Sequence, residues 1–330
     1  MADSPPLVLA ADLGGSRMRA AIVGPDGVVI HRREAPTLAE RGRDDVIARL
    51  ADLLAETRRD AAGAEVIALG LGVPGPVAAT TGVLHSPPNL PGWRDVPLRD
   101  IIAERLGLPV YIGNDANLAA VGEWRHGAGH TPEPVDDLVY LTVSTGIGGG
   151  IISGGHLLTG ADGYATEVGH MTIVTDGPRC SCGNCGCLEA LASGSAIGRA
   201  ARERVASGAE SALLAMADGD IARIDAPLVA QAVAGGDAVA TAVWRDAIEH
   251  LGIGVANLVM LANPRLVVIG GGVAQAGELL FEPLRRAVGA RAWPVFTADL
   301  RIVPAALGDD SGIIGAAALV RQETQQTAGL

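Results

Sequence analysis

The sequence lacks an apolar run long enough for a transmembrane helix, which needs about 20 residues. It also lacks a recognisable secretory signal, because residues 1–6 carry no basic side chain and the apolar stretch 7–11 is short. Basic side chains are outnumbered: 25 Lys and Arg face 37 Asp and Glu, a net charge of −12. These absences predict a cytoplasmic protein whose main partner is neither nucleic acid nor a membrane.

Cysteine is scarce and unevenly placed. All 4 cysteines lie between residues 180 and 187. Such clustering in a cytoplasmic protein favours a metal site over disulfides, and Zn²⁺ takes four nitrogen or sulfur ligands. A structural zinc here would hold the flanking carboxylates Glu167 and Glu189 in place. The spacing excludes none of the candidate ligands, which are His170, Cys180, Cys182, Cys185 and Cys187.

Glycine is abundant, with 45 residues, but forms no low-complexity tract. Glycine-rich loops follow apolar stretches at Asp12–Ser16, Ser144–Gly150 and Gly270–Gly272. Such loops let backbone N–H groups approach phosphate oxygens, and Asp12 beside the first loop suits Mg²⁺. No Gly-Lys-Ser/Thr follows, and the second loop leads into an expected strand. The pattern therefore fits neither a Walker A loop nor a dinucleotide-binding fingerprint.

The segment Asn114-Asp115-Ala-Asn117 joins an expected strand at 110–113 to an expected helix at 115–125. One interpretation is helix N-capping, which Asn and Asp often perform. The other is catalytic: a carboxylate at the end of a strand accepts a hydroxyl proton while Asn114 hydrogen-bonds the same substrate. The residues alone leave both interpretations open.

Expected strands and helices alternate in two rounds, each opened by three short strands. We interpret this as a weak internal repeat and predict an α/β architecture of two lobes with a ligand cleft between them. The expected strands lie at 7–11, 19–23, 28–32, 66–73, 110–113, 138–143, 150–153, 156–158, 266–269 and 300–304. The main expected helices lie at 43–62, 95–106, 115–125, 196–206, 210–216, 227–234, 238–262, 275–288 and 312–321.

These motifs together resemble the ROK family of sugar kinases and repressors, over nearly the whole chain. The most specific part is Glu167-Val-Gly-His170 followed by the Cys-x-Cys-Gly-x-x-Gly-Cys-x-Glu pattern at 180–189. The resemblance extends to further segments, namely Asp12–Ser16, Pro74–Val77, Pro88–Trp93 and Asn114–Asn117.

The resemblance implies a two-lobed actin/hexokinase-like (ribonuclease H-like) ATPase fold. We expect a small α/β domain at 1–117, completed by the C-terminal helix at about 312–330, and a large α/β domain with the zinc site at 118–311. The implied activity is ATP-dependent phosphorylation of a hexose 6-hydroxyl, with glucose first and N-acetylmannosamine, fructose or allose as alternatives. Polyphosphate remains an alternative donor. A non-catalytic sugar-responsive regulator is disfavoured, because a repressor's helix-turn-helix domain has no room before the first expected strand.

Residue by residue, the resemblance assigns Asp115 as the base that takes the proton of the sugar 6-hydroxyl. The residues expected to bind sugar are Gly75, Asn89, Asn114, Asp115, Glu167, His170 and Glu189. Those expected to bind ATP and its Mg²⁺ are Asp12, Gly14, Gly15, Ser16, Thr145, Gly146, Gly271 and Gly272. Zinc would be bound by His170, Cys180, Cys182 and Cys187, with Cys185 left over. The resemblance also implies a homodimer or homotetramer.

Three positions depart from the family pattern. Ser16 replaces the usual Thr and keeps its hydroxyl, and Ser144 stands where Gly is common. Thr166 stands where Gly is common before Glu167, so a β-branched side chain lies beside a carboxylate expected to bind sugar. This last departure bears on which sugar is preferred.

Overall fold

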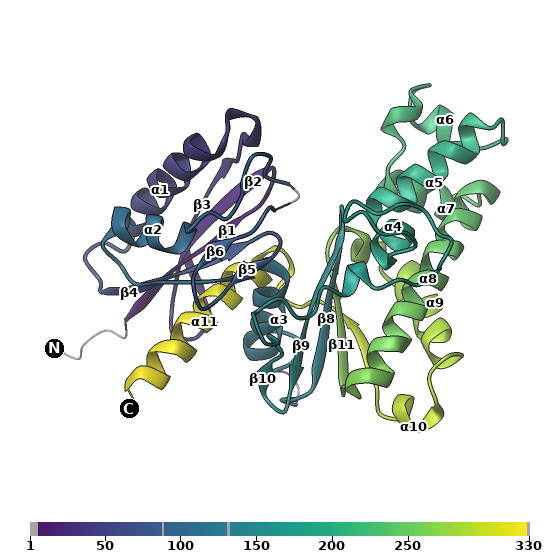
Figure 1. Cartoon of the computed structure of the whole chain (residues 1–330). Coiled ribbons are helices and arrows are strands. Elements are labelled where there is room, and N and C mark those ends of the chain that lie inside the picture. Colours follow the sequence, from purple (N-terminus) through teal and green to yellow (C-terminus); the bar gives the residue numbers. More distant parts are fainter. Residues whose placement is uncertain (1–5, 88, 131–132, 329–330) are drawn as a thin grey trace. The chain divides into compact units, whose positions relative to one another are not determined.

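The computed structural model describes residues 6–87, 89–130 and 133–328 (Figure 1). Two parts of the sequence discussed above lie outside the described residues. They are Pro88 of the predicted sugar segment and residues 1–5, whose lack of basic side chains speaks against a secretory signal. The chain forms two compact units. The first comprises Met1–Asp136, Gly150–Thr166 and Ala306–Leu330, and the second comprises Asp137–Gly149 and Glu167–Ala305.

The first unit is built on a five-stranded sheet with the order β3-β2-β1-β4-β7. β1 to β3 pair antiparallel, whereas β4 runs parallel to both β1 and β7. The strands of this sheet are β1 (Leu7–Leu13), β2 (Arg17–Val23), β3 (Val29–Pro36), β4 (Val66–Val73) and β7 (Val110–Asn114), and the same unit holds a short hairpin of β5 (Val77–Ala78) and β6 (Val83–Leu84). Its helices are α1 (Arg43–Arg59), α2 (Leu98–Leu106), α3 (Asp115–His126), α11 (Ser311–Ala328) and the 3₁₀ turns η1 (Ala39–Arg41) and η5 (Gly308–Asp310).

Helices cover both faces of this sheet, which is why β1 is apolar at successive positions rather than at alternate ones. Leu9 belongs to the cluster that includes Leu50 of α1, and Val8 to the cluster that includes Leu118 of α3. α3 and α11 approach closely because Gly315 has no side chain, and a Cβ there would collide with the Leu118 carbonyl. The C-terminal helix therefore packs in the first unit.

The second sheet has the order β10-β9-β8-β11-β12. In both sheets the strands, numbered by their order along the chain, lie in the spatial order third, second, first, fourth and fifth. This shared topology confirms the predicted internal repeat, and the α/β class is confirmed as well. The strands are β8 (Leu138–Val143), β9 (Ile147–Ser153), β10 (His156–Leu157), β11 (Leu266–Gly270) and β12 (Arg301–Pro304). The remaining helices are α4 (Leu188–Ala192), α5 (Gly194–Ala206), α6 (Leu213–Met216), α7 (Ala226–Ala234), α8 (Ala238–Ala262), α9 (Glu278–Gly289), α10 (Pro294–Thr297), η2 (Val168–His170), η3 (Ile221–Arg223) and η4 (Gly272–Ala276).

Several element boundaries differ from those expected. α2 begins at Leu98 rather than at 95, because Asp95 has a positive φ of 50° and Pro97 precedes the helix. The helix expected at 275–288 begins only at Glu278, since Gly277 breaks it with φ 59°. The expected domain boundary between residues 117 and 118 lies inside α3, which runs unbroken from Asp115 to His126. The first unit instead continues to Asp136.

Within the described part of the chain, no single helix has the length and apolar character to cross a membrane. Only α7 and α8 taken together meet those criteria, and they are bent by 118°.

A buried carboxylate joins α3 to the segment that leads into α11. Glu123 is 0% exposed and accepts backbone N–H bonds from Ala128 (3.0 Å), Ala306 (3.0 Å) and Leu307 (2.9 Å). The Ser311 hydroxyl also donates to it, at 2.8 Å. Buried carboxylates persist only when their oxygens are satisfied in this way. Glu123 therefore fixes the start of the C-terminal segment, Ala306–Leu307, to the rest of the first unit.

Replacing Glu123 by Ala is expected to lower the free energy of unfolding by about 3 kcal/mol or more, because it leaves buried donors without an acceptor. Urea unfolding monitored by circular dichroism measures this. Glu104→Ala, at an exposed position on α2, is the matched control and should change stability by less than about 0.5 kcal/mol. Equal effects of the two substitutions would contradict the assignment.

Candidate functional site

β7 carries Asn114 to the end of the first sheet, where α3 begins with Asp115. Asn114 caps this helix: its Oδ1 accepts from the N–H groups of Ala116 (3.0 Å) and Asn117 (3.1 Å). Its Nδ2 donates to the Gly75 carbonyl at 3.3 Å, which links two residues of the predicted sugar site. The capping interpretation thus describes Asn114. The half-buried Asp115 occupies the first helical position, where the positive end of the helix dipole favours a negative charge.

The first glycine loop, Asp12–Ser16, is anchored by Thr37 and lies against Asn89 of the predicted sugar segment. Thr37 is 0% exposed and donates its hydroxyl to the Gly14 carbonyl at 2.6 Å and its N–H to the Ser16 carbonyl at 2.9 Å. A Cβ on Gly15 would lie 2.5 Å from Cβ of Asn89, so only glycine fits there. Thr37 was not predicted as part of the site, because nothing in the sequence around it marks it as an anchor.

Asp12 at the end of β1 is held by Arg19 of β2. The Arg19 Nε donates to Asp12 Oδ2 at 3.2 Å, and Nη2 contacts the same oxygen. Both side chains are 14% exposed. Because both contacts fall on Oδ2, the arginine orients the carboxylate.

The second glycine loop is shorter than expected. Ser144–Gly146 forms a tight turn in which the Ser144 N–H donates to the Gly146 carbonyl at 2.9 Å, and β9 already begins at Ile147. Gly148–Gly150 therefore belong to a strand. Gly149 is needed for packing, since a Cβ there would lie 2.6 Å from the Tyr140 carbonyl. The expectation that Gly148 and Gly149 continue the loop was wrong, whereas the strand expected from Gly150 is confirmed.

A cavity of about 940 Å³ opens beside this loop within the second unit. Ser144, Thr145 and Gly272 line one part of it, which brings together two of the predicted phosphate loops. Helices α5, α7 and α8 contribute side chains that were not predicted from the sequence, among them Arg202, Gln231 and Trp244. No local motif marks these residues, because each comes from a different helix.

Glu189 connects the second glycine loop to the cysteine segment. Its Oε2 accepts the Ile147 N–H at 3.0 Å, and its Oε1 accepts the Ser181 hydroxyl at 3.3 Å. Gly146 lies so close that a Cβ there would collide with Oε2. One carboxylate thus fixes the positions of both segments relative to each other.

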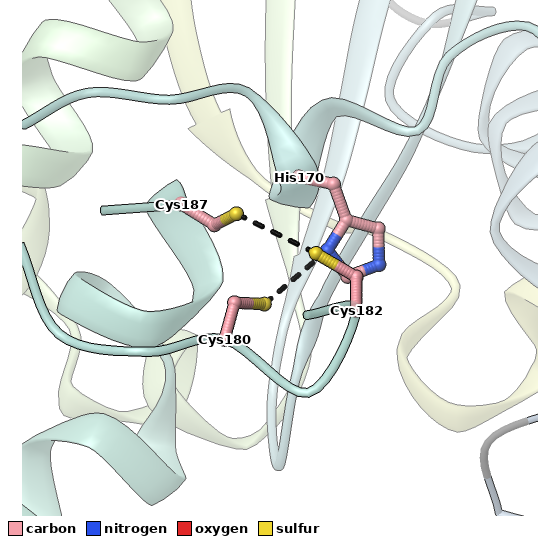
Figure 2. Close-up of side chains that lie close together, drawn as sticks. All are labelled: His170, Cys180, Cys182 and Cys187. Carbon is pink, nitrogen blue, oxygen red and sulfur yellow. Dashed lines mark hydrogen bonds between the residues drawn. The ribbon is translucent and has the colours of Figure 1, made fainter. Parts of the chain in front are cut away.

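Four side chains of the cysteine segment converge as a metal-binding group (Figure 2). The ligand atoms of His170, Cys180, Cys182 and Cys187 all lie within 4.8 Å of one another. His170 Nδ1 lies 3.5 Å from Cys180 Sγ, and the Sγ atoms of Cys182 and Cys187 lie 3.7 Å apart. A tetrahedral zinc has Zn–S and Zn–N bonds of about 2.3 and 2.0 Å, which set S–S and N–S edges of about 3.8 and 3.5 Å. The donor set and its spacing fit zinc, and Cys185 is not in the group.

Backbone pairing brings His170 to the cysteines. η2 ends at His170, and the following Met171 accepts the Leu188 N–H at 2.9 Å. Gly186 adopts φ 68°, and any side chain there would collide with the Val174 carbonyl. This close antiparallel contact sets Cys187, at the start of α4, beside the histidine.

The protein environment shifts the pKa values of two of these thiols, Cys187 and Cys182, in opposite directions. Burial, with the neighbouring Cys182 and Cys180, raises the pKa of Cys187 to about 12. The Asn184 backbone N–H lowers the pKa of the exposed Cys182. A bound divalent cation would reverse the first effect, because a coordinating thiol loses its proton.

Two carboxylates and the histidine interact electrostatically in this unit. Reduced hydration raises the pKa of Glu167; His170 opposes the shift and the Glu189 charge adds to it. The structure thus brings Glu167, His170 and Glu189 together in the second unit, and Gly75, Asn89, Asn114 and Asp115 all lie in the first.

Comparison with known proteins identifies the family. The ROK family model matches residues 8–323. A glucokinase from Thermotoga maritima is 38% identical over 96% of this chain and 97% of its own, and an N-acetylmannosamine kinase from Escherichia fergusonii is 33% identical over 96% and 98%. The crystal structure of a ROK family glucokinase from Streptomyces griseus with glucose and AMPPNP has a TM-score of 0.80 and 35% identity, covering 96% of this chain and 99% of that one. These similarities confirm the predicted actin/hexokinase-like fold, and the chain belongs to the ROK family.

Proposed function

We propose that this protein transfers the terminal phosphoryl group of ATP to the 6-hydroxyl of glucose. The observation that carries the proposal is the 38% identity to a glucokinase along almost the whole chain. Asp115 at the first position of α3 and the adjoining Asn114–Gly75 bond supply the acceptor side of such a reaction.

Asp115 acts as the general base in this proposal. Its carboxylate accepts the proton of the 6-hydroxyl as the oxygen attacks phosphorus, and the P–O bond to ADP breaks. Asn114 is held by its capping bonds and by Gly75, so its amide can orient the sugar without moving. Asn89, Glu167, His170 and Glu189 bind the other hydroxyls and thereby fix the attacking oxygen.

The nucleotide occupies the cavity of about 940 Å³ in the second unit, which Gly272 lines. Gly272 and the adjacent Gly271 lie against the adenosine. Thr145 and Gly146, with Gly14–Ser16 of the first unit, direct backbone N–H groups and hydroxyls at the phosphates. The Asp12 carboxylate and phosphate oxygens would hold Mg²⁺, which supplies neutralisation of phosphate charge. Arg19 keeps the Asp12 carboxylate in one orientation.

Zinc has a structural role in this proposal. The ion would be held by His170 Nδ1 and the sulfurs of Cys180, Cys182 and Cys187, leaving the other ring nitrogen of His170 for a sugar hydroxyl. The same loop carries Ser181, whose hydroxyl orients Glu189. The metal therefore braces one wall of the sugar site.

A second candidate substrate is N-acetylmannosamine, favoured by the relative that is 33% identical. A homodimeric or homotetrameric assembly and a cytoplasmic location complete the proposal.

A coupled assay across glucose, mannose, fructose, allose and N-acetylmannosamine, each with ATP and with polyphosphate, tests the function. We expect the highest kcat/KM for glucose with ATP, and glucose 6-phosphate as the product by NMR. A higher kcat/KM for N-acetylmannosamine would favour the second candidate. No turnover with any sugar would refute the kinase assignment.

A further inference from the structure

Thr166 has an unusual backbone conformation at the residue that precedes Glu167. Its φ is 72°, in the left-handed region where β-branched side chains are rarely found. Such a conformation persists only when surrounding contacts hold it, and such residues concentrate at functional sites.

The contact that holds Thr166 is made by its own hydroxyl. Oγ1 lies 2.6 Å from Oδ1 of Asn117 and 2.5 Å from the Ala165 carbonyl, and donates its proton to one of them at a time. Asn117 is only 5% exposed and lies on α3, in the same turn as Asp115. A buried amide therefore anchors the threonine to the helix that carries the proposed base.

The chain before Thr166 is fixed to the first unit as well. A Cβ on Gly163, which has φ 89°, would lie 3.4 Å from the Ala79 nitrogen, and the Ala165 N–H donates to the Thr159 carbonyl at 3.0 Å. Thr166 is the last residue of this segment, and Glu167 is the first of the next segment of the second unit. The backbone torsion angles of Thr166 therefore set the direction of the chain at Glu167.

We propose that Thr166 is a positioning residue for glucose: its hydroxyl bond to Asn117 maintains the left-handed backbone that aims Glu167 at the sugar. The inference rests on the proposed function and extends it to a residue that does not touch the reacting atoms. It predicts that glucose binding depends on the hydroxyl, whereas folding depends little on it.

Three substitutions separate these contributions. Thr166→Val keeps the shape but removes the hydroxyl, and we expect the glucose KM to rise about 5- to 10-fold while the ATP KM stays within about twofold. Thr166→Ser keeps the hydroxyl and should keep the glucose KM within about twofold of the wild-type value. Thr166→Gly adopts φ 72° without strain but lacks the hydroxyl, so the glucose KM should rise although Tm does not fall.

Ala62→Gly is the matched control, because Ala62 also has a positive φ, 52°, at an exposed position after α1. It should leave both KM values within about twofold of wild type. In a double-mutant cycle, Asn117→Ala should add little to the rise in glucose KM caused by Thr166→Val, since both remove one bond.

Glucose KM values within twofold of wild type for both Thr166→Val and Thr166→Gly would overturn the inference and leave the kinase assignment standing. A KM that follows Tm across the three variants would also overturn it, in favour of a purely structural role. Absence of glucose turnover by the wild type would overturn the proposed function and this inference together.

Discussion

Asp115→Asn is expected to lower kcat for glucose phosphorylation by about 10³-fold, the typical contribution of a general base. The amide cannot accept the 6-hydroxyl proton, but it can still accept the Ala116 N–H that Asp115 accepts at 2.8 Å. Helix α3 should therefore form normally, and glucose affinity should change little. Steady-state kinetics and isothermal titration calorimetry with glucose measure the two quantities separately.

The matched control is Asp44→Asn, the same substitution in the first turn of α1 in the same unit. It should leave kcat within about twofold, because surface substitutions away from a site have small effects. If Asp115→Asn retained a tenth or more of the wild-type kcat, Asp115 would not be the base.

Cys182→Ser is expected to abolish zinc binding and to lower both Tm, by about 10 °C, and glucose affinity, by about 10-fold. One exposed ligand is lost, so the direct effect on core packing is small. The loss of affinity follows from the release of His170 and of the Ser181 hydroxyl that orients Glu189. Metal content by mass spectrometry, thermal unfolding and calorimetry measure these changes.

Cys185→Ser is a stringent control, because it replaces a cysteine of the same segment that is outside the metal-binding group. It should retain one zinc per chain and wild-type glucose affinity. Equal loss of zinc in both variants would disprove the ligand set. If chelation removed the zinc and glucose affinity remained unchanged, the metal would be a structural crosslink without influence on the sugar site.

Much of the candidate site could be predicted because its residues are close in sequence. Asn114 and Asp115 are adjacent, and a strand followed by an Asn predicts both the helix start and the position of the carboxylate. The cysteine segment is equally local. Prediction failed where glycine had two possible uses: Gly148 and Gly149 resemble a phosphate loop, yet both belong to β9, where the absence of a side chain on Gly149 makes room for the Tyr140 carbonyl.

Residues whose partners are distant in sequence were missed. Glu123 is bonded to Leu307, 184 positions away, and nothing near either residue indicates the pair. Thr37 supports the first glycine loop from the end of another strand. The cavity depends on Trp244 and on side chains from other helices, which no linear pattern connects. Such contacts arise only when the sheets and helices pack.

The sequence by itself determined the alternation of strands and helices, the repeat of three strands that opens each round and the chemical types at the site, because apolar periodicity and short-range motifs are local properties. The tertiary structure decided which four of the five candidate ligands converge, since Gly186 and the pairing of Met171 with Leu188 bring His170 to three sulfurs. It also decided that Thr166 is held by Asn117 in a conformation that its residue type disfavours. Both outcomes depend on distances between segments, which packing sets and sequence spacing does not.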